Sequence, residues 1–119
     1  MLAAIWICLA THVGADDRVL VHLDFEEAQV RPLELPLAFT EIGGEGTAFP
    51  RFGRMGLSEE TAHSGRFSFR FDLNGRSMAA RSLPGTIPIL PRVDHRIEVM
   101  VQTRDLKQAG VRLVAWLLD

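Results

Sequence analysis

Apolar and polar residues alternate most regularly within residues 57–72, which therefore organise the prediction of the whole fold. Three aromatic residues alternate there with polar ones: Phe67, Phe69 and Phe71 with Ser68, Arg70 and Asp72. A period of two is typical of a strand with one buried face. We therefore expect a strand over residues 67–72 with its phenylalanines in the core. A shorter strand should precede it, joined by a turn at His63, Ser64 and Gly65.

The same alternation predicts strands along most of the remaining chain. The predicted ranges are residues 18–25, 37–42, 77–83, 94–103 and 111–118, with 86–90 as an edge segment. Gly, Pro and Asn-Gly signals separate these ranges at intervals typical of an antiparallel sandwich or barrel. No helical period is sustained outside the N-terminus. We predict an all-β fold, an antiparallel β-sandwich over residues 16–119.

The first residues follow a different pattern. Residues 2–13 are almost continuously apolar, and Val13-Gly14-Ala15 places small residues before the polar Asp16. This pattern predicts a secretory signal peptide over residues 1–15, and hence a secreted, periplasmic or cell-envelope protein. The alternative is a buried N-terminal strand. The run is shorter than the roughly 20 residues that a membrane-spanning helix needs, so we expect no span in the mature chain.

Composition narrows the choice of partners. The 119 residues suit one domain, and 47% hydrophobic with 24% charged residues is ordinary for a globular protein. A formal charge of −2 and a pI near 6.1 offer no general attraction for phosphate backbones. We therefore expect no nucleic-acid partner. Cys8 is the only cysteine and would leave with the signal, so the mature chain should contain no disulfide.

No catalytic constellation is recognisable. Glu26-Glu27 and Glu59-Glu60 are adjacent carboxylates, and neighbours in a strand point to opposite faces. His63-Ser64 lacks the strand-to-helix unit of a nucleophile elbow. Gly43-Gly44-Glu45-Gly46 has no following helix to bind phosphate, and the histidines lack metal-ligand spacing. We therefore predict a protein that is not an enzyme.

Three segments resemble one known family. Residues 61–70, Thr-Ala-His-Ser-Gly-Arg-Phe-Ser-Phe-Arg, resemble the "aHSGkySl" strand-turn-strand of galactose-binding-like jelly rolls, which include carbohydrate-binding modules of bacterial glycanases. Phe25-Glu26-Glu27 is similar to the "FE" after the family's first strand, and residues 87–101 to a later hairpin. The resemblance implies a jelly-roll sandwich. The family's last strands have no counterpart here, so we expect a piece of a longer protein.

The resemblance also implies a structural calcium. Asp24 or Glu26 would supply carboxylate oxygen, and His63 or Ser64 backbone oxygen, which are ligands that suit a hard cation. The alternative is that the acidic residues are solvated loop charges.

Carbohydrate binding is the function that the resemblance implies. Sugar sites use flat aromatic side chains as stacking platforms with polar groups around them. The candidate ligand-binding residues are Trp116, Arg70, Arg96 and Arg112. In the predicted alternation, the three arginines would point to the same side of three strands. Trp116 could equally belong to the core, and charged outer faces are usual on sandwich strands. We expect a non-catalytic module that binds polysaccharide or cell-surface glycan. The alternative is a structural or protein-interaction domain without a sugar site.

Overall fold

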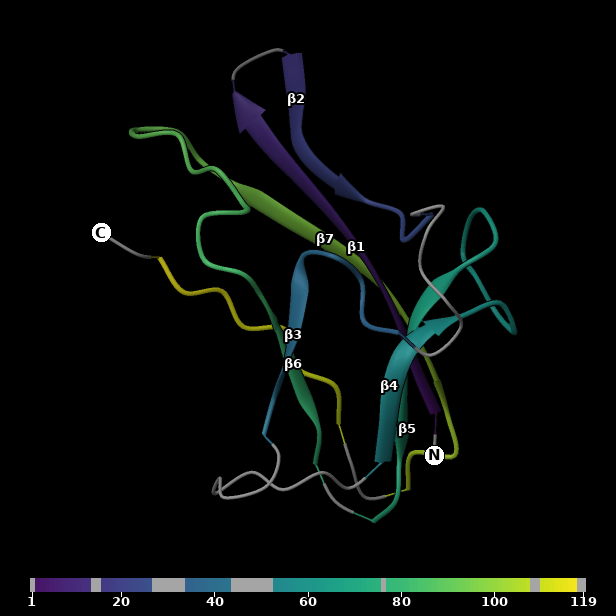
Figure 1. Ribbon diagram of the computed structural model, residues 1–119. Coiled ribbons are helices and arrows are strands. Elements are labelled where there is room, and N and C mark those ends of the chain that lie inside the picture. The colour runs from purple at the N-terminus through teal and green to yellow at the C-terminus, as the bar shows by residue number, and fades with distance from the viewer. Residues whose placement is uncertain are drawn as a thin grey trace.

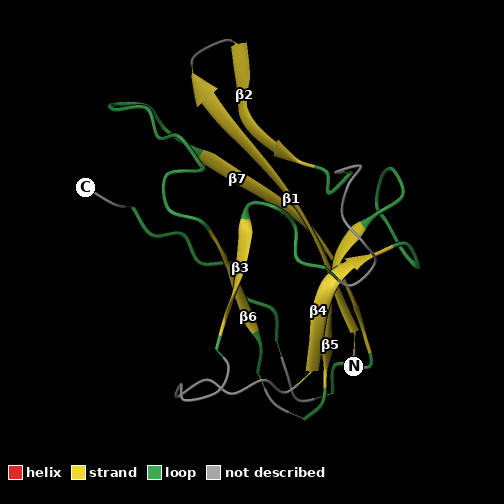
Figure 2. Cartoon of the chain, in the orientation of Figure 1, coloured by secondary structure: helices red, strands yellow, loops and turns green. Residues whose placement is uncertain are grey.

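Strands alone make up the regular structure of the described residues, and no helix occurs among them (Figure 1, Figure 2). The computed structural model describes residues 2–13, 16–26, 34–43, 53–75, 77–107 and 110–117, with the backbone alone for 2–13, 16 and 17. The strands form two antiparallel sheets. The predicted all-β class is confirmed at this level.

The larger sheet is built around its first strand. Its members are β1 (Leu2–Val13), β2 (Asp16–Leu23), β4 (Gly53–Ser58), β5 (Ser68–Leu73) and β7 (Arg96–Arg104). β7 pairs with β1 over residues 2–10, while β5 pairs with residues 2–5 and β2 with residues 7–13. Both edges of β1 are therefore used. Residues 2–13, which were predicted to belong to a signal peptide, form the strand with which β2, β5 and β7 pair.

The smaller sheet consists of two short strands, β3 (Phe39–Ile42) and β6 (Ala79–Ser82). They pair antiparallel from Phe39 opposite Ser82 to Ile42 opposite Ala79. The backbone N–H of Leu83 extends the pairing by donating to the carbonyl of Ala38 at 2.8 Å. Both strands lie within their predicted ranges.

An aromatic cluster joins the two sheets. Phe25, Met55, Leu57 and Phe69 are buried, and Phe39 of β3 packs against them. The ring centroids of Phe39 and Phe69 are 5.3 Å apart, and those of Phe25 and Phe69 are 5.8 Å apart. These separations are typical of favourable aromatic pairs. The core therefore sits where β3 meets β4 and β5.

The phenylalanine strand follows its prediction. Phe69 is 2% exposed, and Phe67 and Phe71 are partly buried against the same cluster. The preceding turn contains Gly65 at a positive φ of 67°. The strand and its turn are therefore confirmed, but burial on one face alone is not, because Ser68 on the opposite face is only 1% exposed.

Two predicted strands are wrong. Residues 111–117 have no regular secondary structure, although Leu118 of the same prediction lies outside the described residues. No described strand pairs with this segment, and a strand needs a partner edge for its backbone groups. Residues 86–90 also form no strand, because the chain turns at Pro84-Gly85, where the N–H of Thr86 donates to the carbonyl of Leu83 at 3.3 Å.

Two boundaries also differ. β4 begins at Gly53, four residues before the start of residues 57–72, in which the shorter strand was predicted. A Cβ on Gly53 would lie 1.9 Å from the carbonyl oxygen of Asp72, so close pairing with β5 requires glycine there. The strand predicted over 18–25 runs from Asp16 to Leu23 instead, and Phe25 enters the core from a left-handed turn at φ 62°. Of the glycine-rich segment over residues 43–46, all but Gly43 lies outside the described residues.

Candidate functional site

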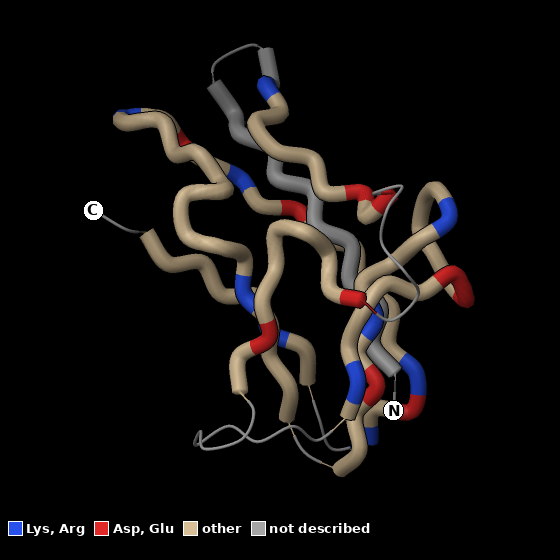
Figure 3. Tube along the Cα trace, in the orientation of Figure 1, with Lys and Arg blue, Asp and Glu red and all other residues tan. Residues whose placement is uncertain are grey.

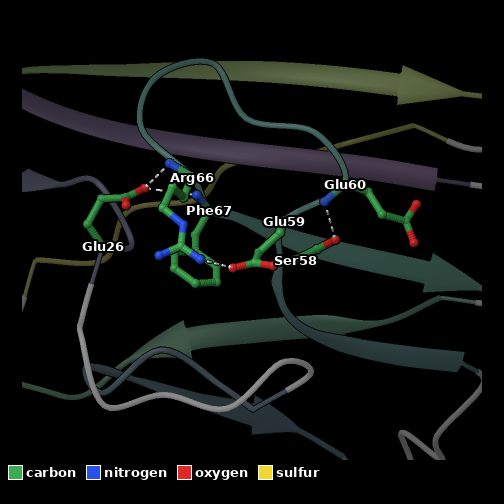
Figure 4. A network of polar contacts seen from close by, with 6 residues as sticks. All are labelled: Glu26, Ser58, Glu59, Glu60, Arg66 and Phe67. Carbon is green, nitrogen blue, oxygen red and sulfur yellow. Dashed lines mark hydrogen bonds and ion pairs between the residues drawn. The ribbon is translucent and has the colours of Figure 1, made fainter.

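The carboxylate of Glu26 binds the backbone of the predicted turn (Figure 4). Its Oε1 accepts the N–H of Arg66 at 2.7 Å and the N–H of Phe67 at 2.8 Å. A Cβ on Gly65 would lie 2.3 Å from the same oxygen. Gly65 is therefore required for two reasons: its backbone has a positive φ, and the Glu26 carboxylate approaches where a Cβ would lie.

The two residues before Glu26 fix the position of its carboxylate. Oδ1 of Asp24 accepts the N–H of Glu26 at 3.1 Å, which is the Asx pattern that stabilises a turn. The intervening Phe25 has a left-handed backbone and a side chain only 1% exposed. Burial of this ring therefore carries the following carboxylate to a turn forty residues away in sequence.

The residues predicted to bind calcium are thus only partly brought together. Glu26 reaches the turn, but it contacts amide N–H groups rather than the carbonyls of His63 or Ser64. Asp24 contacts the backbone of Glu26. Among the described residues, no group of three or more His, Cys, Asp or Glu is placed to hold a metal ion. The calcium site stays a prediction.

Exposed contacts surround the anchored turn. Arg66 pairs with Glu59 at 2.6 Å, with side chains 74% and 50% exposed, and its guanidinium lies 5.4 Å from the centre of the Phe67 ring. Ser58 Oγ accepts the N–H of Glu60 at 3.3 Å (Figure 4). Ion pairs this exposed contribute little to stability. The Glu26 carboxylate therefore dominates the anchoring of the turn.

Arg70 is engaged within the protein. Its side chain is 16% exposed, and its Nε donates to Oδ1 of Asp72 at 2.8 Å while a terminal nitrogen pairs with Glu60. The hydrogen bond to Asp72, and then the one to Glu60, raise the pKa of the Arg70 guanidinium above its ordinary value. This arginine is already neutralised by two carboxylates.

The three predicted arginines do not form one site in this structure. Arg70 lies opposite Ala4 and Arg96 opposite Ala10 of β1, which separates them by about 20 Å at the rise of a strand. Arg96 pairs with Glu98 at 2.9 Å. Arg112 lies on residues 110–117, outside both sheets. Acidic and basic residues intermingle along the described trace (Figure 3).

Trp116 is strongly exposed in this structure. Its side chain is 70% exposed. Large apolar residues flank it on the same segment: Val111, Leu113, Val114 and Leu117 are 37%, 51%, 57% and 76% exposed. The interpretation of Trp116 as a core residue is wrong for this structure, so its indole is free to stack on a ligand.

Sequence reasoning missed the anchoring role of Glu26 and the exposure of β7. Ile97, Met100 and Val101 of that strand are 38%, 48% and 43% exposed. The alternation of residues 94–103 predicts a strand but carries no information on whether anything covers it. Gly65, between Ser64 and Arg66, likewise gives no signal for a distant carboxylate.

Comparisons with known proteins identify no similar protein. No protein-family model matches the chain, and neither the curated proteins nor the solved structures contain a significant match. Within the described residues, no helix is long and apolar enough to cross a membrane. The function must therefore be argued from the residues themselves.

Proposed function

We propose that this protein is an exported, non-catalytic module that binds carbohydrate or attaches to a glycan surface, with Trp116 as its stacking platform. We further propose that its two sheets belong to a jelly-roll sandwich. The contact of Phe39 with Phe69 between the sheets supports the sandwich, and the resemblance of residues 61–70 supports the jelly roll. The apolar residues 2–13 support export.

The exposure of Trp116 is the observation that carries this proposal. An indole that is 70% exposed has not been used for packing. Flat aromatic faces stack on sugar rings, and nearby polar groups orient the ligand. Arg112, four residues earlier on the same segment, is exposed and can donate hydrogen bonds to hydroxyl or carboxylate groups.

A second candidate is a structural or protein-interaction domain, which the apolar neighbours of Trp116 favour. Contiguous exposed apolar residues usually mark a protein interface. Leu117 is even more exposed than Trp116, at 76%. A protein interface would use both side chains, whereas a sugar platform needs the indole alone.

Retention on insoluble polysaccharides, together with a glycan array, tests the proposal. We expect the exported protein, without residues 1–15, to be retained and Trp116→Ala to abolish retention, while Leu117→Ala and the remote control Leu37→Ala leave it unchanged. Leu37 is 73% exposed, so its truncation removes an equally accessible apolar side chain elsewhere. Absence of retention on every glycan favours the second candidate. Equal loss with Trp116→Ala and Leu117→Ala also favours an apolar protein interface.

A further inference from the structure

Two apolar segments of this chain have the character of a strand, but only one of them occupies a sheet. Residues 2–13 form β1, between β7 on one edge and β5 with β2 on the other. Residues 111–117 are also mainly apolar, with Arg112 as their one charged residue, yet they lie exposed and pair with no described strand. The segment that occupies the sheet is the one whose sequence predicts a signal peptide.

We infer that residues 111–117 take the place of β1 when residues 1–15 are removed, and that this exchange assembles the carbohydrate-binding face. The inference rests on the proposed function, because it requires export with cleavage of the leader. It also deepens that function, since it states when the site forms and which residues line it.

The direction of the chain suits the exchange. β1 runs antiparallel to β7, β5 and β2. Residues 111–117 follow β7 in sequence, so a simple reversal brings them back antiparallel to it. Residues 105–109 are left for the loop between Arg104 and Gly110, and Asp105 already has a left-handed φ of 56°. A hairpin from β7 would therefore enter the vacated position in the orientation of β1.

The register is set by which residues face the core. With Leu113 at the position of Ile5, it would lie opposite Val101 of β7 and Phe69 of β5. Directly opposed residues share a face, so Leu113 would join the side of Phe69. The apolar replacements on that side are then Val111, Leu113, Ala115 and Leu117 at the positions of Ala3, Ile5, Ile7 and Leu9. A shift by one residue would turn Arg112 toward Phe69.

The opposite face would then collect the predicted ligand-binding residues. Arg112 would take the position of Ala4, directly opposite Arg70. Trp116 would take the position of Cys8, opposite Glu98, with Arg96 as its diagonal neighbour at about 7–8 Å. Arg112 and Trp116 would be about 13 Å apart along the strand. Such a face could contact several sugar units of one glycan chain.

The backbone supplies the driving force. Loss of β1 would leave β7, β5 and β2 each with an unpaired edge where they now contact it. Unpaired strand edges recruit another strand, and buried backbone groups need partners. Residues 111–117 are adjacent to β7 in sequence and bring exposed side chains that gain from burial.

Disulfide trapping in the full chain tests the exchange. The background contains Cys8→Ser and a site-specific protease sequence inserted between residues 15 and 16. Val101→Cys with Leu113→Cys reports the inferred register, because directly opposed residues are close enough for a disulfide. Val101→Cys with Val114→Cys is the matched control, since the second cysteine would lie on the other face. Non-reducing mass spectrometry and gel mobility are measured before and after cleavage.

We expect the 101–113 disulfide to go from trace to main species on cleavage, within a monomer, while the 101–114 pair stays reduced. Equal yields for the two pairs, an unchanged 101–113 yield on cleavage, a disulfide-linked dimer or unfolding on cleavage would each overturn the exchange. Met1 at the N-terminus of the exported protein would also overturn it, because the leader would then be retained.

Polysaccharide retention separates this inference from the proposed function. We expect retention to appear with cleavage and to persist in the disulfide-locked protein. A locked protein that binds no glycan would refute the carbohydrate function while the exchange stands. Equal retention before and after cleavage would instead show that the site does not need the exchange, and would overturn its assembly by residues 111–117.

Discussion

Replacement of Gly65 by Ala should release the turn from Glu26. A left-handed backbone costs alanine about 1–2 kcal/mol. Its Cβ would also collide with the Glu26 carboxylate, 2.3 Å from Oε1. A hydrogen bond to a charged group contributes roughly 1.5–3 kcal/mol, and because the bond from Arg66 is exposed we take this range for the two amide hydrogen bonds together. We therefore expect Gly65→Ala to lower the free energy of unfolding by about 2.5–5 kcal/mol.

Two single variants separate these contributions. Gly85→Ala is the control for backbone strain, since Gly85 has a φ of 78° and open space around its would-be Cβ. It should cost only about 1–2 kcal/mol. Glu26→Ala should cost about 1.5–3 kcal/mol, because it removes the acceptor and leaves the amides of Arg66 and Phe67 without it. Glu26→Gln keeps an acceptor oxygen and should cost less.

The double variant decides whether the clash acts through Glu26. In Glu26→Ala with Gly65→Ala the collision is gone and the hydrogen bonds are already lost, so the total should stay near that of Gly65→Ala alone. The coupling energy should then be about 1.5–3 kcal/mol. Urea unfolding followed by far-UV circular dichroism measures each free energy. Additivity within about 0.5 kcal/mol would refute the anchoring role of Glu26.

Three further predictions follow from the core, from Arg70 and from the predicted calcium site. Phe69→Ala should lower the free energy of unfolding by about 3–5 kcal/mol, because its ring is buried between the sheets. The control Leu37→Ala should change it by no more than about 0.5 kcal/mol. Equal unfolding midpoints for the two variants would show that the core is misplaced. Arg70→Met should cost about 1 kcal/mol, since its carboxylate partners are partly exposed. Because the pKa of Arg70 is raised in the folded protein, its contribution to the free energy of unfolding is complete at any pH below the ordinary pKa of arginine. This contribution is lost only as the pH rises past the raised pKa of the folded protein. The difference in unfolding free energy between Arg70→Met and the parent should therefore be constant between about pH 7 and 10. Calcium should raise the melting temperature of the protein and a chelator should lower it, and both shifts should be smaller in Asp24→Asn. A melting temperature that changes with neither calcium nor chelator would refute the calcium site.

Part of the fold could be predicted because it depends on neighbours in sequence. The period of two around Phe69 shows that the phenylalanine side is buried, but not that Ser68 on the other side is buried too, and Gly65 marks the reversal before the strand. β3, β6 and β7 lie in their predicted ranges for the same reason, except that β7 extends to Arg104. Alternation says nothing of pairing partners, so the exposed faces of β7 were not foreseen.

The candidate site was predictable in its residue types and not in its arrangement. Trp116 was recognised as an aromatic residue that could face solvent, and the structure exposes it. The alternation of side chains predicted that Arg70, Arg96 and Arg112 share one face. Alternation places residues on a common face only when their strands belong to one sheet, and Arg112 lies outside both sheets.

By itself, the sequence determined the all-β class, the buried side of the phenylalanine strand and the turn that precedes it, because each follows from residues a few positions apart. Only the tertiary structure decided that residues 2–13, rather than 111–117, lie at the centre of the larger sheet. It also decided that Glu26 binds a turn forty residues away. Both are contacts between segments far apart in the sequence, and a local pattern carries no information on which distant segments meet.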